Sequence, residues 1–168
     1  TLTNKIYFAI GQIYLKEENY EAAKNYFLKC IKNNPNFEME FYAKIYYAKS
    51  SNTLKENEIL AYFKKLLRDK KNVDYLDKVY FELGNYYLFN NNYDKALENF
   101  SISIKKNQRN KALLFRSYLE IAEIYYDKIN NYELSKLYYD SAITNINREH
   151  KRYKEIKEKS NILSELVK

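Results

Sequence analysis

The chain has 168 residues, of which 46% are hydrophobic and 30% are charged, so it is long enough to bury a sizeable core and short enough to form one domain. Two Gly and one Pro are too few for the many turns of a β-protein, which argues against that class and favours long helices with short connections. The formal net charge of +7 would suit nucleic acid or an anionic membrane surface, but the Lys residues are interleaved with Glu, which favours a solvated surface.

The first predicted element is a pair of helices within residues 2–35. Its segment FAIGQIYLKEENYEAAKNYF contains two runs of apolar residues at helical spacing, separated by the polar stretch KEEN. The dipeptide Asn34–Pro35 ends the second helix, because the residue before Pro avoids helical geometry. The apolar residues of the two runs are Ile6, Ile10, Ile13 and Tyr14, then Tyr20, Ala23, Phe27 and Ile31.

A second pair is expected within residues 36–72, from EFYAKIYYAKSSNTLKENEILAYFKKLL. Ala43 and Tyr46 stand at helical spacing before a longer link, SSNTLKEN, and Ile59, Phe63 and Leu66 continue the pattern after it. This segment therefore predicts two helices with a longer connection than in the first pair.

The third pair, within residues 74–110, repeats the first at a constant offset of 73 residues. Its segment FELGNYYLFNNNYDKALENF needs no gap to align with the first copy. The residues shared by the two copies are Phe8, Gly11, Tyr14, Leu15, Asn19, Tyr20, Ala23 and Phe27 in the first, and Phe81, Gly84, Tyr87, Leu88, Asn92, Tyr93, Ala96 and Phe100 in the third.

A fourth pair and a final helix complete the chain. YLEIAEIYYDKINNYELSKLYYDSAI, within residues 111–147, has one extra residue in its turn and offers Ala122, Tyr125, Ser135, Tyr139 and Ala142 in the repeated roles. Residues 148–167 have an apolar side and charges elsewhere, which predicts an amphipathic helix that covers the last apolar face. The apolar side consists of Tyr153, Ile156, Leu163 and Val167.

This pattern resembles the tetratricopeptide repeat: a small residue, Tyr three residues later, Ala after a turn, an aromatic residue four later, then Pro. The resemblance implies an all-α fold, an α-solenoid of about four helix pairs with a C-terminal capping helix. The small residues of successive pairs are 32, 41 and 38 residues apart, so the array is irregular. We expect residues 1–168 to form a single repeat domain that is a fragment of a longer protein, since Thr1 stands where Met would begin a chain.

A narrower resemblance covers residues 37–168. LLRDKKNVDYLDKVYFELGNYYL, the fourth repeat and YKEIKEKSNILSELV look like a segment of the tetratricopeptide lipoprotein of the Bacteroidota type IX secretion and gliding-motility machinery. That family implies an envelope-anchored scaffold that couples other secretion components and carries a lipid on an N-terminal Cys. Cys30 lies inside a repeat helix, so anchoring here is implied by resemblance alone.

The chain lacks the groups that catalysis requires, so we expect no enzyme, no catalytic residue, no metal and no cofactor. His150 has no second His and no Cys beside it to complete a metal site. Cys30 replaces the Ala of the repeat, which predicts a small buried side chain, and a single Cys excludes an internal disulfide. Neither Gly11 nor Gly84 has a second Gly nearby to form a phosphate loop.

In tetratricopeptide arrays the first helix of each pair lines a concave groove, which the resemblance makes the candidate partner-binding surface. Lys5, Lys78 and Arg116 are cations at equivalent places in three pairs, and they could hold an acidic peptide or a C-terminal carboxylate through charge-assisted hydrogen bonds. Solvated helix faces explain the same residues equally well. The predicted groove residues are Lys5, Gln12, Lys16, Lys44, Tyr47, Lys78, Asn85, Arg116, Glu123 and Tyr126.

The sequence therefore favours a non-catalytic scaffold for protein–protein interaction, with other proteins as partners and no small-molecule substrate. By resemblance it belongs to a Bacteroidota secretion and gliding-motility assembly at the cell envelope, on the periplasmic face of the outer membrane, held by an anchor outside this chain. The alternative is a cytoplasmic adaptor or peptide receptor that binds an acidic segment. An RNA-binding helical repeat is a more remote alternative, which salt-dependent retention on nucleic acid would support.

Overall fold

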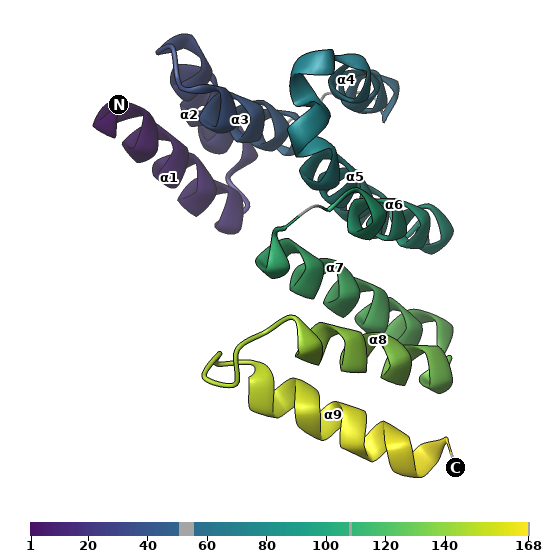
Figure 1. The fold of residues 1–168 in the computed structure, drawn as a ribbon. Coiled ribbons are helices and arrows are strands. Elements are labelled where there is room, and N and C mark those ends of the chain that lie inside the picture. The colour runs from purple at the N-terminus through teal and green to yellow at the C-terminus, as the bar shows by residue number, and fades with distance from the viewer. Residues whose placement is uncertain (51–55, 108, 168) are drawn as a thin grey trace. The chain divides into compact units, whose positions relative to one another are not determined.

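The computed structural model describes residues 1–50, 56–107 and 109–167, and every regular element within these ranges is a helix (Figure 1). The chain divides into two compact units, residues 1–65 and 66–168. The first three helices of the first unit pack against one another in chain order, and so do the helices of the second unit. This all-α arrangement of helix pairs confirms the predicted fold class. The predicted link SSNTLKEN lies largely outside the described residues.

Unit 1 is held together by aromatic rings from three helices. Its elements are α1 (Leu2–Lys16), α2 (Tyr20–Lys32), α3 (Phe37–Lys49) and most of α4 (Glu56–Arg68). Phe27 of α2 is fully buried, and its ring lies 5.6 Å from that of Phe8 in α1 and 5.4 Å from that of Tyr46 in α3. Edge-to-face and stacked rings at these distances add to the burial of apolar area. α1, α2 and α3 therefore share one aromatic core.

Unit 2 contains two consecutive helix pairs and the C-terminal helix. Its elements are the 3₁₀ helix η1 (Lys70–Tyr75), α5 (Leu76–Phe89), α6 (Tyr93–Lys106), α7 (Lys111–Ile124), the π-helix η2 (Tyr125–Ile129), α8 (Tyr132–Thr144) and α9 (Tyr153–Leu166). One apolar cluster joins α5, α6 and α7, and a second joins α7, α8 and α9. Helix α7 contributes to both clusters and so connects the two pairs.

The turn inside a helix pair has the same backbone form in three pairs. One residue takes a left-handed conformation with φ of 57° or 58°, and the Asn that follows caps the second helix. Each capping side chain accepts a hydrogen bond from the backbone N–H three residues later, which satisfies a free donor of the first turn. The left-handed residues are Glu18, Asn91 and Asn130, and the caps are Asn19, Asn92 and Asn131.

The extra residue of the fourth pair is taken up by the π-helix η2. In all three turns the backbone N–H of the capping Asn donates to the carbonyl of a Tyr at 2.9 Å. This Tyr stands three positions after the small residue of the repeat. These carbonyls belong to Tyr14, Tyr87 and Tyr125. Because η2 adds one residue to this turn, Asn131 still makes the same backbone hydrogen bond as Asn19 and Asn92, and it caps α8 in the same way.

Gly11 and Gly84 allow the paired helices to touch. A Cβ atom on Gly11 would lie 2.7 Å from the ring of Phe27, and one on Gly84 would lie 2.7 Å from the ring of Phe100. Such distances are shorter than any normal carbon contact. The predicted role of these small residues, close approach of two helices, is thus confirmed. In the fourth pair Ala122 takes this position, opposite the fully buried Tyr139.

A polar contact between the paired helices also recurs at the 73-residue offset. The Cys30 thiol donates to the backbone carbonyl of Asn4 at 3.5 Å, and the Ser103 hydroxyl donates to the carbonyl of Asp77 at 2.7 Å. Cys30 is fully buried, as predicted from its place in the repeat. Burial also raises the pKa of its thiol, and the positive N-terminus opposes this effect in part, so the protonated thiol is favoured.

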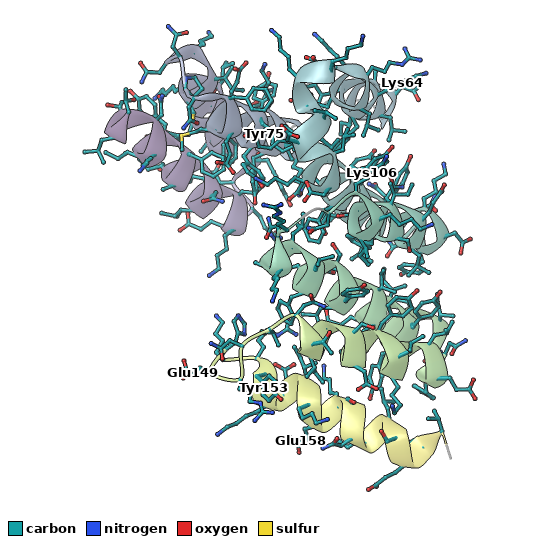
Figure 2. The ribbon with its side chains drawn as sticks, viewed as in Figure 1. Lys64, Tyr75, Lys106, Glu149, Tyr153 and Glu158 are labelled. Atoms are coloured by element: carbon teal, nitrogen blue, oxygen red, sulfur yellow. The ribbon has the colours of Figure 1, made fainter. Side chains whose placement is uncertain are left out.

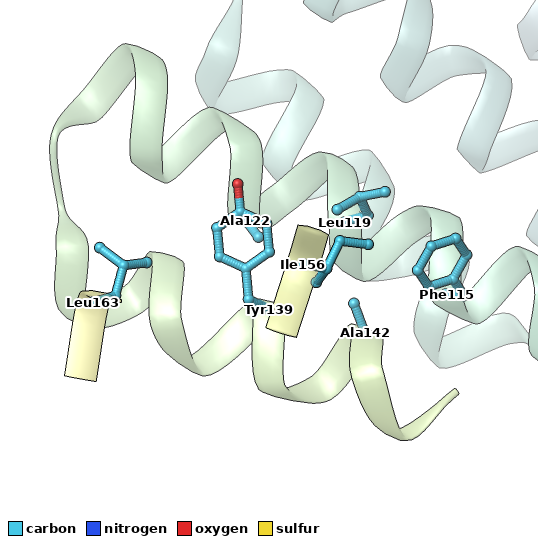
Figure 3. Packing of buried hydrophobic residues seen from close by; sticks show 7 residues of the cluster. All are labelled: Phe115, Leu119, Ala122, Tyr139, Ala142, Ile156 and Leu163. Atoms are coloured by element: carbon cyan, nitrogen blue, oxygen red, sulfur yellow. The ribbon is translucent and has the colours of Figure 1, made fainter. Parts of the chain in front are cut away.

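Helix α9 covers the apolar side of the last pair, as predicted, and Figure 3 shows the buried residues of their shared cluster. Ile156 is fully buried and Leu163 is 1% exposed, and both lie in one cluster with Phe115, Leu119 and Tyr139. The helix begins at Tyr153, later than the predicted boundary of 148.

None of the described helices combines the length and apolar character that a bilayer crossing requires. The single-domain organisation and the repeat boundaries stay predictions.

Candidate functional site

In unit 1, three of the predicted groove residues form one exposed row on α1. Lys5, Gln12 and Lys16 are exposed and are spaced by seven and four residues, which places them on one side of the helix. On α3, Lys44 is half-buried and forms an ion pair with Glu40. Tyr47 is also half-buried.

In unit 2, the predicted groove residues of α5 and α7 make contacts within the unit. The Lys78 ammonium lies 4.9 Å from the centre of the Tyr75 ring, and Asn85 donates to the carboxylate of Glu82 at 3.3 Å. Arg116 is exposed, with its guanidinium 4.4 Å from the centre of the ring of Phe81 in α5. A cation over a ring is attracted by the negative face of the π-system. Arg116 is thereby held beside α5, one helical turn beyond Lys78.

The last two predicted residues are engaged within the fourth pair. The carboxylate of Glu123 accepts a hydrogen bond from the guanidinium of Arg152 at 2.8 Å, which ties α7 to the segment that precedes α9. Tyr126 is half-buried, and its ring lies 5.7 Å from that of Tyr132 in an edge-to-face arrangement. Both residues therefore contribute contacts to the repeat itself.

A cavity of about 290 Å³ opens in unit 2, where the turn between α5 and α6 faces the end of α7. Its wall combines apolar and aromatic side chains with three carboxylates and one ammonium group. The lining residues are Leu88, Asn91, Tyr93, Glu120, Glu123, Ile124, Asp127 and Lys128. Of the predicted groove residues, only Glu123 lines it. The local charge of this cavity is negative, in contrast to the net charge of the chain.

Glu120 has the most perturbed carboxylate of this cavity. Burial raises the pKa of Glu120, the negative charges of Glu123 and Glu82 raise it further, and Arg116 and Arg152 act in the opposite direction. Among the described residues its carboxylate accepts no hydrogen bond and forms no ion pair. The charged form of Glu120 is therefore disfavoured in the folded chain.

Sequence reasoning missed the acidic wall of the cavity, although a signal for it was present. Glu120, Glu123 and Asp127 are spaced by three and four residues, which places three carboxylates on one face of a helix. Leu88 and Tyr93 of the wall come from another pair, and no spacing in the sequence brings Leu88 to Ile124. This part of the wall depends on the packing of α5, α6 and α7.

Glu120→Gln is expected to raise the free energy of unfolding at pH 7 by less than about 1 kcal/mol, because the side chain keeps some solvent contact. Since the pKa of Glu120 is raised in the folded state, the wild type loses stability as the pH rises through that pKa, and the neutral amide avoids this loss. Urea unfolding at pH 4 and pH 7 would measure the effect. The two chains should differ at pH 7 and converge at pH 4. The exposed Glu98→Gln on α6 is the control, and an equal gain there would contradict the prediction.

The chemistry-bearing residues identified in the sequence do not come together in the described part of the chain. His150 is exposed, its ring 5.5 Å from that of Phe115. Within residues 1–50, 56–107 and 109–167, no group of three or more His, Cys, Asp or Glu side chains is arranged to hold a metal ion. The cavity can instead attract a positive charge and bury a small apolar group.

Comparison with known proteins agrees with the geometry. The model of the tetratricopeptide repeat family matches residues 5–37 and 77–112, which cover most of the pairs α1–α2 and α5–α6. A solved structure described as "Crystal structure of MamA protein" aligns with a TM-score of 0.52 over 98% of this chain and 86% of that chain, at 17% identity. At this identity the likeness shows the fold alone. No curated protein matched the sequence. The repeats at residues 5–37 and 77–112, the repeated turn and the shared fold together support the tetratricopeptide repeat family for this chain.

Proposed function

We propose that the chain is a non-catalytic scaffold that binds other proteins through side chains on the first helices of its repeats. Tetratricopeptide folds generally serve as interaction scaffolds, and the repeated framework here supports that role. The observation that carries the proposal is the recurrence of a cation at one repeat position, with Arg116 held in place over the ring of Phe81. A side chain held in this way loses less conformational freedom when it binds.

The proposed ligand is a segment of another protein with acidic residues opposite Lys78 and Arg116. Both cations belong to unit 2, and the ring of Phe81 connects Arg116 to the helix that carries Lys78. The cavity lined by Glu120 is negatively charged, unlike the surface around Lys78 and Arg116, so an acidic group of the ligand would be repelled from it. We therefore expect the acidic residues of the segment to lie at the start of α5 and α7, away from the cavity.

The resemblance to the Bacteroidota lipoprotein supports a finer proposal, that the partner is another component of a secretion and gliding-motility assembly at the cell envelope. In that setting the membrane is reached through an anchor outside this chain. A cytoplasmic adaptor for an acidic segment would use the same residues. Identification of the captured partner by mass spectrometry distinguishes these settings, because an envelope protein supports the first and a cytoplasmic protein the second.

The double variant Lys78→Glu with Arg116→Glu is expected to weaken binding of a deca-glutamate peptide by about tenfold or more, since both charges act on one ligand. The control Lys151→Glu with Lys154→Glu changes the net charge equally at exposed positions near α9. Fluorescence anisotropy at low and high salt, with circular dichroism to confirm folding, would measure it. Capture of proteins from a whole-cell extract of the source organism would then be compared between the two variants.

Equal weakening by both double variants would mean diffuse attraction by net charge and would contradict the proposal. Full retention of every captured protein by the Lys78 and Arg116 variant would also contradict it, and would direct attention to the exposed turns at residues 90–92 and 130–131. Preferential binding of single-stranded RNA over the peptide at high salt would favour the RNA-binding alternative.

A further inference from the structure

Helix α1 presents a row of exposed apolar side chains. Leu2 is 74% exposed, Ile6 47% and Ile13 56%, and the exposed Ala9 lies between them. Spacings of four, three and four residues put all four on one face of the helix. Single exposed apolar residues are common, but a continuous row along a helix is typical of a surface that contacts another helix.

The same repeat positions are buried in α7. At the offset that relates Gly11 to Ala122, the counterparts of Leu2, Ile6 and Ile13 are Leu113, Ser117 and Ile124, which are 5%, 1% and 2% exposed. Leu113 and Ile124 lie in one cluster with Phe100 of the preceding helix α6. The exposed row on α1 therefore corresponds to the face that accepts a packed helix elsewhere in the chain.

Helix α9 has an exposed face that is apolar in its C-terminal half and carries the ion pair of Glu155 and Lys159 in its N-terminal half. Ile162 is 52% exposed and Leu166 65%, while the same helix buries Ile156 and Leu163. Glu158 and Glu165 are exposed four residues before and three residues after Ile162, so they flank this face, and Figure 2 labels Glu158 on α9. Lys154 stands at the margin of the same face.

The charges beside the two faces are complementary. Lys5 and Lys16 are exposed and flank the row on α1, and neither they nor Glu158 and Glu165 form an ion pair among the described residues. Contact of α1 with α1, or of α9 with α9, would place like charges together. We propose that the row on α1 docks against the exposed face of α9 in a second copy of this chain, where Ile162 and Leu166 meet the row and the Lys side of α1 lies beside the carboxylates of α9.

The proposed contact joins one helix face from each copy, which is small for a stable protein interface. We therefore expect weak association with a Kd on the order of 100 µM. The contact uses Lys5, the counterpart of Lys78 and Arg116 in the first pair, but neither of the two cations in unit 2 that are proposed to bind the acidic segment. Its failure would leave the scaffold function untouched, and loss of peptide binding would leave self-association intact.

Charge exchange between copies tests the proposal. In sedimentation equilibrium from about 10 to about 500 µM, the wild type should show a rising average mass, and Ile6→Glu should weaken the association by about tenfold or more. Lys5→Glu with Lys16→Glu should abolish it, as should Glu158→Lys with Glu165→Lys. An equimolar mixture of these two double variants should associate again, because the acidic α1 of one meets the basic α9 of the other.

The matched control is Lys64→Glu with Lys106→Glu, which makes the same change in net charge at two exposed positions on α4 and α6, both labelled in Figure 2. It should associate like the wild type. A wild-type chain that stays monomeric at the highest concentration would overturn the proposal. So would loss of association in Ile6→Glu but not in Ile162→Glu, which would mean that α1 contacts something other than α9.

Discussion

Gly84→Ala is expected to lower the free energy of unfolding by about 1–3 kcal/mol, although Ala is the better helix former. The added Cβ would lie 2.7 Å from two ring carbons of Phe100, a fully buried side chain that is packed between α5, α6 and α7. The ring cannot move away without disturbing Phe81 or Ala96, which belong to the same cluster. The helices of the pair must then separate slightly, and the cluster loses contacts.

The sign of the change makes this prediction decisive. Helix propensity alone predicts that Gly84→Ala stabilises the chain by about 1 kcal/mol. Urea unfolding followed by circular dichroism would measure the sign, and Gly84→Leu should be more destabilising than Gly84→Ala. In the double variant Gly84→Ala with Phe100→Leu, the smaller partner should recover part of the loss relative to the sum of the single changes. Stabilisation by Gly84→Ala would mean that the two helices do not touch at this residue.

Leu163→Ala is expected to destabilise unit 2 by about 2–5 kcal/mol, because it leaves a cavity at a fully packed site. Leu163 is 1% exposed and lies in one cluster with Tyr139 and Ile156, where α9 packs on α8 (Figure 3). The adjacent Ile162 is 52% exposed and supplies a matched control on the same helix. Ile162→Ala should change the free energy of unfolding by no more than about 0.5 kcal/mol.

Thermal and urea unfolding at low concentration would compare the two variants without any contribution from self-association. Hydrogen exchange would show which helices lose stability, since the amides of α8 and α9 should lose protection in Leu163→Ala while those of α1 and α2 keep theirs. Equal effects of Leu163→Ala and Ile162→Ala would mean that α9 is rotated about its axis relative to the arrangement described above. No effect of either would mean that α9 contributes nothing to the stability of the last pair.

The helix pairs could be predicted from sequence because their determinants are local or nearly so. Gly11 and Gly84 stand at the contact between paired helices, and an Asn stands at the start of the second helix in three pairs, so spacing alone located these turns. The extra residue of the fourth turn was also visible in the sequence. Its conformation, the π-helix η2, was not, because the cap of α8 and the packing of α7 together decide how an extra residue is accommodated.

The candidate site was predictable only in part. The position of Arg116 followed from the repeat, but its contact with the ring of Phe81 did not. Glu123 was expected to point toward a partner, and its pairing with Arg152, which is 29 residues away in the sequence, was not predicted. Partners at that separation are chosen by the path of the chain between α8 and α9, which no periodicity describes.

For this protein the sequence by itself determined which segments are helices, where the turns of three pairs fall and which residues must be small, because these depend on backbone geometry and on neighbours within a few positions. Only the tertiary structure decided which apolar residues are buried. Ile6 and Ile13 were counted with the apolar run of the first helix, yet α2 and α3 pack against α1 from the other side and leave both exposed. It also decided that Glu120 and Asp127 share a cavity with Leu88. Helical spacing states only which side chains share a face, whereas burial and local charge depend on the helices that pack against that face.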